Sequence, residues 1–229
     1  MGTKNPFEAR KVVSRRNRPA KEPLSREAIV KAALELLASE GLEGMSLRKV
    51  AAQLHTGPAS LYVYVENLPA LQALVLDQAL ADVELPSSTR GTWRKRLDAL
   101  LRSYLQVLFK RPGLAQLAMT TVAAGPHALR IFEALLGLFD EAGLEPAVAA
   151  WAVDLITLYV TAVAAEQSHH RQQEDPLGPV TRAIRLASPE QFPRVHALRE
   201  ELLSGGSTRV TWALEVLITG ILKTPLPRT

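Results

Sequence analysis

The 229-residue chain contains no cysteine, which excludes disulfide bonds, thiolate metal sites and a cysteine nucleophile. It also lacks a long apolar run, because the most apolar region, residues 147–165, is interrupted by Asp154 and two threonines. The Lys- and Arg-rich amino terminus lacks the apolar stretch of a signal peptide. We therefore expect a soluble, cytoplasmic protein.

Motifs that carry enzyme chemistry are absent as well. The sequence has no phosphate-binding P-loop, dinucleotide fingerprint, zinc-binding helix motif or nucleophile elbow. Glu166, His169 and His170 have the spacing of metal ligands on a helix, but histidines commonly collect at helix ends, so solvated side chains are the simpler interpretation. We expect neither an enzyme nor a metal site or cofactor.

No segment shows the alternating pattern of a β-strand, whereas apolar residues recur at helical spacing from residue 25 onward. Proline and glycine interrupt the pattern at intervals. The sequence predicts an all-α fold in three parts: a mostly disordered arm (1–24), a helical domain with a connecting helix (25–84) and a second helical domain (89–223).

Positive charge is concentrated at one end of the chain. Residues 1–70 carry eleven Lys or Arg and seven Asp or Glu, a net charge of 11 − 7 = +4, while residues 71–229 carry sixteen of each. A basic arm beside a folded domain is typical of proteins that bind polyanions, although such an arm also serves simply as a solubilising tail.

Residues 25–67 predict three short helices. Ser25 and Ser46 are suited to cap the first two, Gly41 ends the first, and Pro58 opens the third after the turn His55-Thr56-Gly57. In the third helix we expect Leu61, Tyr62 and Val65 to face inward and Ala59, Ser60, Val63 and Tyr64 to face outward. Two short helices joined by a three-residue turn and packed on a preceding helix are typical of a helix-turn-helix.

The segment 24–71 resembles the amino-terminal domain of the tetracycline-repressor (TetR) family. The most specific matches are Glu40-Gly41-Leu42, residues 45–51 (MSLRKVA), and Leu61-Tyr62 followed by Tyr64. The resemblance implies an all-helical homodimer with an amino-terminal helix-turn-helix domain and a helical carboxyl-terminal domain for effector binding and dimerisation. It also implies a sequence-specific transcriptional regulator.

The resemblance assigns DNA contacts residue by residue. Ser46 is matched to a phosphate contact, and Arg48 can reach a base edge or the backbone. The groove-facing start of the third helix holds Thr56, Gly57, Ala59 and Ser60, and Tyr62 and Tyr64 match positions that touch phosphate or base, although Tyr62 fits a core role equally well.

Three positions depart from the family pattern. His55 stands where a glycine commonly allows a left-handed turn, Val65 replaces an aromatic residue, and Leu68 replaces a lysine that contacts phosphate. One phosphate contact is thereby lost. We expect Arg15, Arg16 and Arg18 in the basic arm to compensate along the DNA backbone or in a minor groove.

The carboxyl-terminal domain is less specific in sequence. By analogy with the family, long helices at 146–168 and 208–222 would pair with those of a second subunit through Trp151, Leu155, Val210, Ala213, Leu214 and Leu217. Asp154, Thr157 and Thr161 form a polar stripe on an apolar helix. They are candidates to line an effector pocket with Tyr104, Met119, His127 and Tyr159, or else to bond across the dimer interface.

The sequence thus predicts a repressor that a small-molecule effector releases from a palindromic double-stranded operator. Two alternatives stay open: an activator of the same fold, and a helical interaction protein whose basic arm meets acidic surfaces.

Overall fold

The computed structural model describes residues 24–87, 91–171, 174–175, 177–206 and 208–227, and these contain helices and no strand. The predicted all-α fold is confirmed. The helices are α1 (Arg26–Gly44), α2 (Leu47–Gln53), α3 (Pro58–Leu61), α4 (Leu68–Leu80), α5 (Trp93–Phe109), α6 (Leu114–Thr120), α7 (Pro126–Glu141), α8 (Pro146–His170), α9 (Gly178–Arg185), α10 (Pro193–Ala197), α11 (Arg199–Leu203) and α12 (Thr208–Lys223).

Side-chain caps fix where α1, α2 and α4 begin. Ser25 Oγ accepts a hydrogen bond from the N–H of Ala28 at 3.1 Å, and Asn67 Oδ1 accepts one from Ala70 at 2.8 Å. Each bond satisfies an amide that has no partner inside its own helix. The starts predicted at Ser25 and Ser46 are therefore confirmed.

Helix α1 changes direction at Gly41, where φ is 72°. Only glycine adopts this conformation without a steric penalty, and it breaks the helix before one further turn ending at Gly44. Gly41 was predicted to end the helix, and the regular part of the helix does end there.

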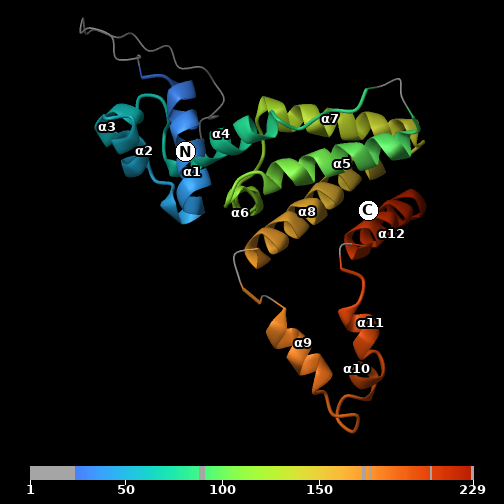
Figure 1. Cartoon of the computed structure of the whole chain (residues 1–229). Helices are drawn as coiled ribbons and strands as arrows, with labels where there is room; N and C mark the ends of the chain where they lie inside the picture. Colours follow the sequence, from blue (N-terminus) through green and yellow to red (C-terminus); the bar gives the residue numbers. More distant parts are fainter. Residues whose placement is uncertain (1–23, 88–90, 172–173, 176, 207, 228–229) are drawn as a thin grey trace, which may run out of the picture.

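Helix α8 is the central element of the carboxyl-terminal part and packs against α5, α6, α7 and α12 (Figure 1). Apolar side chains of α5 and α7 are buried in this packing, among them Leu100 and Phe139. By length and composition alone α8 could cross a membrane, although the sequence analysis found no apolar run long enough to do so. This is weak evidence, because one side of α8 is buried against its four neighbours.

Helices α9, α10 and α11 form an arm that leaves the end of α8 and returns to α12 (Figure 1). Although these three helices contact one another, none of them contains a buried residue. Six large apolar side chains are exposed along it: Leu177, Val180, Leu186, Phe192, Leu198 and Leu202. The arm therefore adds little to the apolar core of a single chain.

The amino-terminal helices meet the rest of the chain through α4 and α6, which both contact α1. Gly113, at the start of α6, has φ 78° and lies so close to α1 that an added Cβ would be 2.7 Å from the backbone nitrogen of Leu42. A backbone contact this close leaves no room for a side chain. It fixes the distance between α6 and the bend in α1.

Candidate functional site

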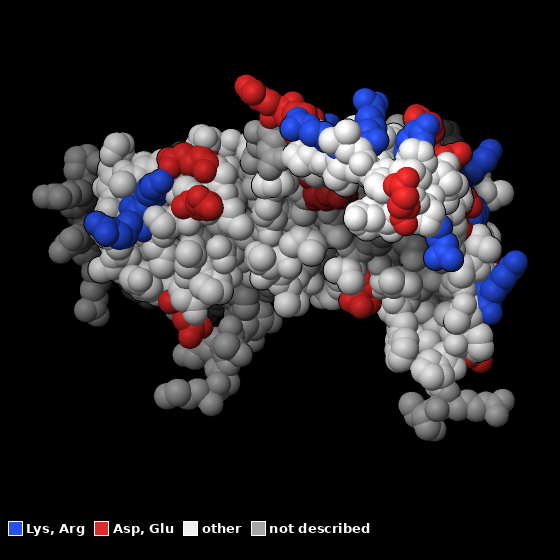
Figure 2. All heavy atoms as spheres, turned by 90° about the horizontal axis from the view of Figure 1, so that it is seen from below, with Lys and Arg blue, Asp and Glu red and all other residues white. Residues whose placement is uncertain are grey.

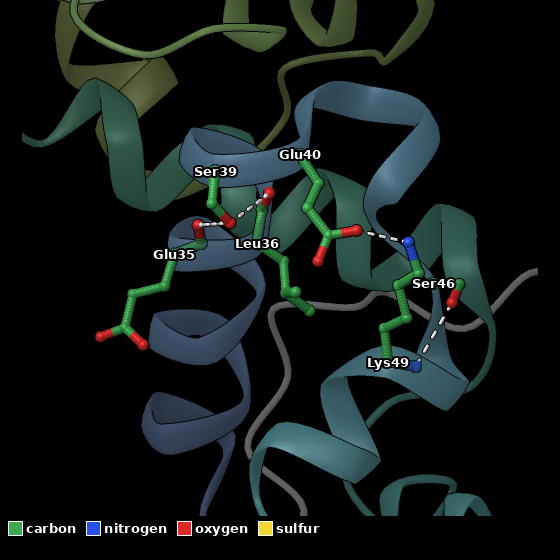
Figure 3. A network of polar contacts seen from close by, with 6 residues as sticks. All are labelled: Glu35, Leu36, Ser39, Glu40, Ser46 and Lys49. Atoms are coloured by element: carbon green, nitrogen blue, oxygen red, sulfur yellow. Dashed lines mark hydrogen bonds and ion pairs between the residues drawn. The ribbon is translucent and has the colours of Figure 1, made fainter.

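Polar contacts on the outer surface hold α2 against α1 (Figure 3). Ser46 Oγ accepts a hydrogen bond from the N–H of Lys49 at 3.3 Å, and the Lys49 ammonium forms an ion pair with Glu40 on α1. Further along α2, Gln53 donates to the Glu35 carboxylate at 2.6 Å. The contacts of Lys49 and Gln53 with α1 supplement the buried packing of Val50 and Ala51.

The turn between α2 and α3 has the hydrogen bonds of a Schellman motif. The N–H of Thr56 donates to the carbonyl of Ala51, and that of His55 donates to Ala52, both at 2.9 Å. His55 occupies the left-handed position with φ 51°, the only non-glycine residue with positive φ among those described. The departure from glycine noted in the sequence therefore falls on the position where glycine is favoured.

The outer face of α3 is small and weakly polar. Gly57, Pro58 and Ala59 are exposed and Ser60 is half-buried, while Leu61 and Val65 are buried beneath them, as predicted. The orientation predicted for Tyr62 is wrong, since its side chain is 52% exposed.

Tyr64, predicted to face outward, is half-buried and packs against the core. Helix α3 ends at Leu61, and residues 62–64 form a turn. Helical spacing correctly placed Leu61 and Val65 inside, but it did not predict which of the two tyrosines is covered.

The two basic side chains of α2 differ in their surroundings. Lys49 is paired with Glu40, whereas Arg48 is exposed and takes part in none of the ion pairs of the described residues. Arg15, Arg16 and Arg18 lie outside the described residues. On the face shown in Figure 2, basic and acidic side chains are mixed.

The predicted dimerisation residues lie on α8 and α12. Trp151 is 60% exposed and Leu155 is also exposed, while Val210, Ala213, Leu214 and Leu217 are partly buried. Trp151, Asp154, Leu155 and Leu217 line a hollow of about 790 Å³ between α8, α12 and residues 224–227. Its walls are mostly apolar, so this side of the chain is an apolar surface without a covering element among the described residues.

The predicted effector residues lie at several separate positions in the carboxyl-terminal part. Tyr104 on α5 and Thr161 on α8 are both buried and share a hydrogen bond of 2.8 Å between their hydroxyl oxygens. Burial raises the pKa of Tyr104, and the bond to Thr161 only partly opposes this. Thr157 instead donates to the backbone carbonyl of Val153 on its own helix at 2.7 Å.

The other four predicted residues lie apart from this pair. Met119 is exposed on α6, His127 is half-buried at the start of α7, and Asp154 faces the α8–α12 hollow. Tyr159 lines a second outer hollow, where burial first and the nearby charge of Glu166 second raise its pKa.

Two polar residues that the sequence analysis missed lie at interior positions. The side-chain oxygen of Gln116 on α6 is buried without a hydrogen-bond partner among the described residues. A lone glutamine in the apolar helix LAQLAMT was the available signal. Asp77 on α4 is also buried, and its carboxylate accepts hydrogen bonds from the N–H groups of His127 and Ala128, each at 3.0 Å.

Within the described part of the chain, no three His, Asp or Glu side chains are grouped so as to hold a metal ion. Glu166 and His169 are exposed and His170 is half-buried at the end of α8.

Two family profiles match the chain. Residues 29–65 match "Bacterial regulatory proteins, tetR family", and residues 85–224 match "Tetracyclin repressor-like, C-terminal domain". The first match contains α2, its turn and α3, and the second contains α5–α12.

Two curated regulators from Streptomyces and Saccharopolyspora are similar to the chain. The chain is 35% identical over 161 residues to the HTH-type transcriptional repressor DrrR1 of Streptomyces coeruleorubidus, covering 70% of this chain and 60% of DrrR1. It is 32% identical over 152 residues to an HTH-type transcriptional regulator of Saccharopolyspora erythraea, covering 66% of this chain and 64% of that regulator. The match thus spans less than two thirds of each relative.

Solved structures agree over a longer range. The Streptomyces coelicolor protein ActR, in complex with actinorhodin, superimposes with a TM-score of 0.80 at 33% identity, covering 88% of this chain and 97% of ActR.

Proposed function

The chain belongs to the tetracycline-repressor (TetR) family of bacterial regulatory proteins, and we propose that it is a homodimeric repressor released from a palindromic operator by a small-molecule effector. The observation that carries this proposal is the construction of residues 46–64. The Ser46 cap and the Schellman turn hold α2 and α3 on a buried core, while Arg48 and Tyr62 remain exposed beside the small outer face of α3.

DNA contacts of three kinds are supported by chemistry. The Ser46 hydroxyl can donate to a phosphate while its oxygen accepts from Lys49, and Arg48 can neutralise a phosphate or pair with guanine. Thr56, Gly57, Ala59 and Ser60 are short enough to allow the backbone close to the groove. Tyr62 and Tyr64 add hydroxyl donors, and Arg15, Arg16 and Arg18 add charge along the backbone.

A homodimer through α8 and α12 is supported by their exposed apolar side chains. Trp151 on α8 and Trp212 on α12 are 60% and 69% exposed, and exposed tryptophans are characteristic of subunit interfaces. A twofold contact of this surface with its copy would present two helix-turn-helix units to one palindrome.

An effector pocket among α5, α6 and α8 is supported by the buried polar atoms found there. Tyr104 and Thr161 satisfy each other, whereas the buried oxygen of Gln116 lacks a donor, which a bound ligand could provide. Met119, His127, Asp154, Thr157 and Tyr159 remain proposed contacts at the edges of the same domain. Because ActR binds actinorhodin, that compound is the first probe to test.

Helix α6 could transmit the effect of a bound effector to the DNA-binding helices. Helix α6 contacts α8 and α5 on one side and α1 on the other, and Gly113 joins it closely to the bend in α1. A ligand that binds better when α6 is displaced would favour dimers whose recognition helices no longer fit successive major grooves.

Selection of bound sequences from random duplexes tests the proposal, with scrambled duplex and anionic lipid vesicles as controls. We expect one palindromic motif, and affinity that falls as the salt concentration rises.

Removal of residues 1–21 should weaken DNA binding and make the affinity depend less on salt. An unchanged salt dependence would refute the role of the basic amino-terminal arm. Equal binding to scrambled duplex, or binding to vesicles alone, would favour an interaction protein. Target-gene expression that falls in a deletion strain would favour an activator.

A further inference from the structure

The segment that would face DNA bases lacks the side chains that usually identify them. From Thr56 to Tyr64 there is no Lys, Arg, Asn, Gln, Asp or Glu. Those side chains make the specific hydrogen-bond pairs with guanine, adenine and cytosine in the major groove, and the bidentate pairs among them discriminate most strongly. Hydroxyl groups are the only polar side-chain groups in this segment, and a hydroxyl both donates and accepts, so it discriminates weakly.

An apolar surface stands in their place. Ala59 is exposed, and Val63, which the resemblance did not assign to DNA, is 49% exposed. The N–H of Val65 donates to the carbonyl of Leu61 at 2.9 Å, so an α-helical turn continues past the end of α3. Ala59 and Val63 are four residues apart and therefore lie on one face, and the buried side chains of Leu61 and Val65 face the core.

Ala59 and Val63 are not needed for the packing of this segment against the core. Leu61 and Val65 provide that packing, since they are only 0% and 2% exposed. The methyl groups of Val63 and Ala59 remain available to a partner on the outer side.

We propose that Ala59 and Val63 form a surface that recognises the C5-methyl group of thymine in the operator, an inference that rests on the proposed DNA-binding function. The thymine methyl is the one apolar group that the base pairs present in the major groove. Val63 is then a specificity-determining residue, and each half-site contains a thymine whose methyl group it buries.

Deoxyuridine tests this directly, because it pairs as thymine does and lacks only the methyl group. In the selected operator, each thymine of both half-sites is replaced in turn by deoxyuridine, and the affinity of the full chain is measured. We expect one or two positions per half-site where each replacement weakens binding about three- to fivefold, the effect of leaving one methyl group unburied.

The Val63→Ala variant connects the effect to its residue. Its affinity for the thymine operator should fall, and replacement by deoxyuridine at the sensitive position should then change affinity less than twofold. Val122→Ala is the matched control, because Val122 is 83% exposed in the segment between α6 and α7, away from the helix-turn-helix. It should retain the full sensitivity to deoxyuridine.

Two results would overturn the inference: equal affinity of the unaltered chain for every deoxyuridine duplex, or undiminished sensitivity in Val63→Ala. Thermal unfolding of each variant verifies that it is folded. Failure to select any operator would instead refute the proposed function, so the two failures are distinguishable.

Discussion

The carboxylate of Asp77 accepts a hydrogen bond from the backbone N–H of Ala128, 51 residues further along the chain, at a distance of 3.0 Å. Helix α7 begins at Gly125 and Pro126, and neither provides a side-chain cap. Asp77, on α4, supplies that cap from another helix, and its charge is favourable at the positive end of α7. The helix that leaves the helix-turn-helix is thereby bonded to the carboxyl-terminal part.

Asp77→Ala should lower the free energy of unfolding by about 1 to 3 kcal/mol, because the buried N–H of Ala128 and the partly buried N–H of His127 lose their acceptor. Urea denaturation measures this. Asp77→Asn is the matched control, since its amide oxygen still accepts, and we expect a smaller loss. Equal stability of Asp77→Ala and the unaltered chain would contradict the assignment.

His55→Gly should raise the free energy of unfolding by about 0.5 to 1 kcal/mol, because glycine relieves the left-handed strain and loses part of this gain to its greater freedom when unfolded. The measurement is again urea denaturation. His55→Ala keeps the strain and should show no such gain. If alanine stabilised the chain as much as glycine, the backbone explanation would fail.

Trp151→Glu should convert the proposed dimer into a monomer and weaken operator binding, because a carboxylate would have to be buried at the α8–α12 surface. Analytical ultracentrifugation measures the mass. Leu129→Glu is the control, since Leu129 is also exposed but lies on α7. A dimeric Trp151→Glu variant would argue for a different interface.

Alkaline pH should destabilise the chain through Tyr104. Burial raises the pKa of Tyr104 in the folded state above its value of about 10 in the unfolded chain. The contribution of the neutral tyrosine to the free energy of unfolding is therefore complete below about pH 10, and it is lost as the pH rises toward the folded pKa. Tyr104→Phe should cost about 1 kcal/mol at pH 7, where Thr161 loses its partner, and lose less stability than the unaltered chain between pH 10 and 11. Parallel losses in both proteins would exclude Tyr104 as the cause.

Local signals in the sequence predicted much of the fold. Ser25 and Ser46 act through bonds to residues three positions away, and Gly41 ends a helix through its own backbone conformation. Such features depend only on neighbouring residues, so they can be recognised before the tertiary structure is known.

The relationships that the sequence did not predict are long-range or lie in irregular backbone. Nothing near Asp77 indicates that it caps a helix beginning 49 residues later, at Pro126. Tyr62 and Tyr64 lie just beyond the four-residue helix α3, and the spacing did not show that Tyr64, rather than Tyr62, packs against the core. The candidate effector residues repeat along α8, but only Thr161 is buried against Tyr104, because α8 borders different elements along its length.

The contact of Gly113 with Leu42 sets a rule for exchanging parts between relatives. The spacing there is fixed by two backbones, so it does not depend on which side chains surround it. A chimera could take its effector-binding helices from another member of the family and keep the orientation of this helix-turn-helix, provided that the donor also has a glycine at this junction. If the donor had alanine there instead, the added methyl group would push α6 away from α1 and shift the grafted helices relative to the helix-turn-helix.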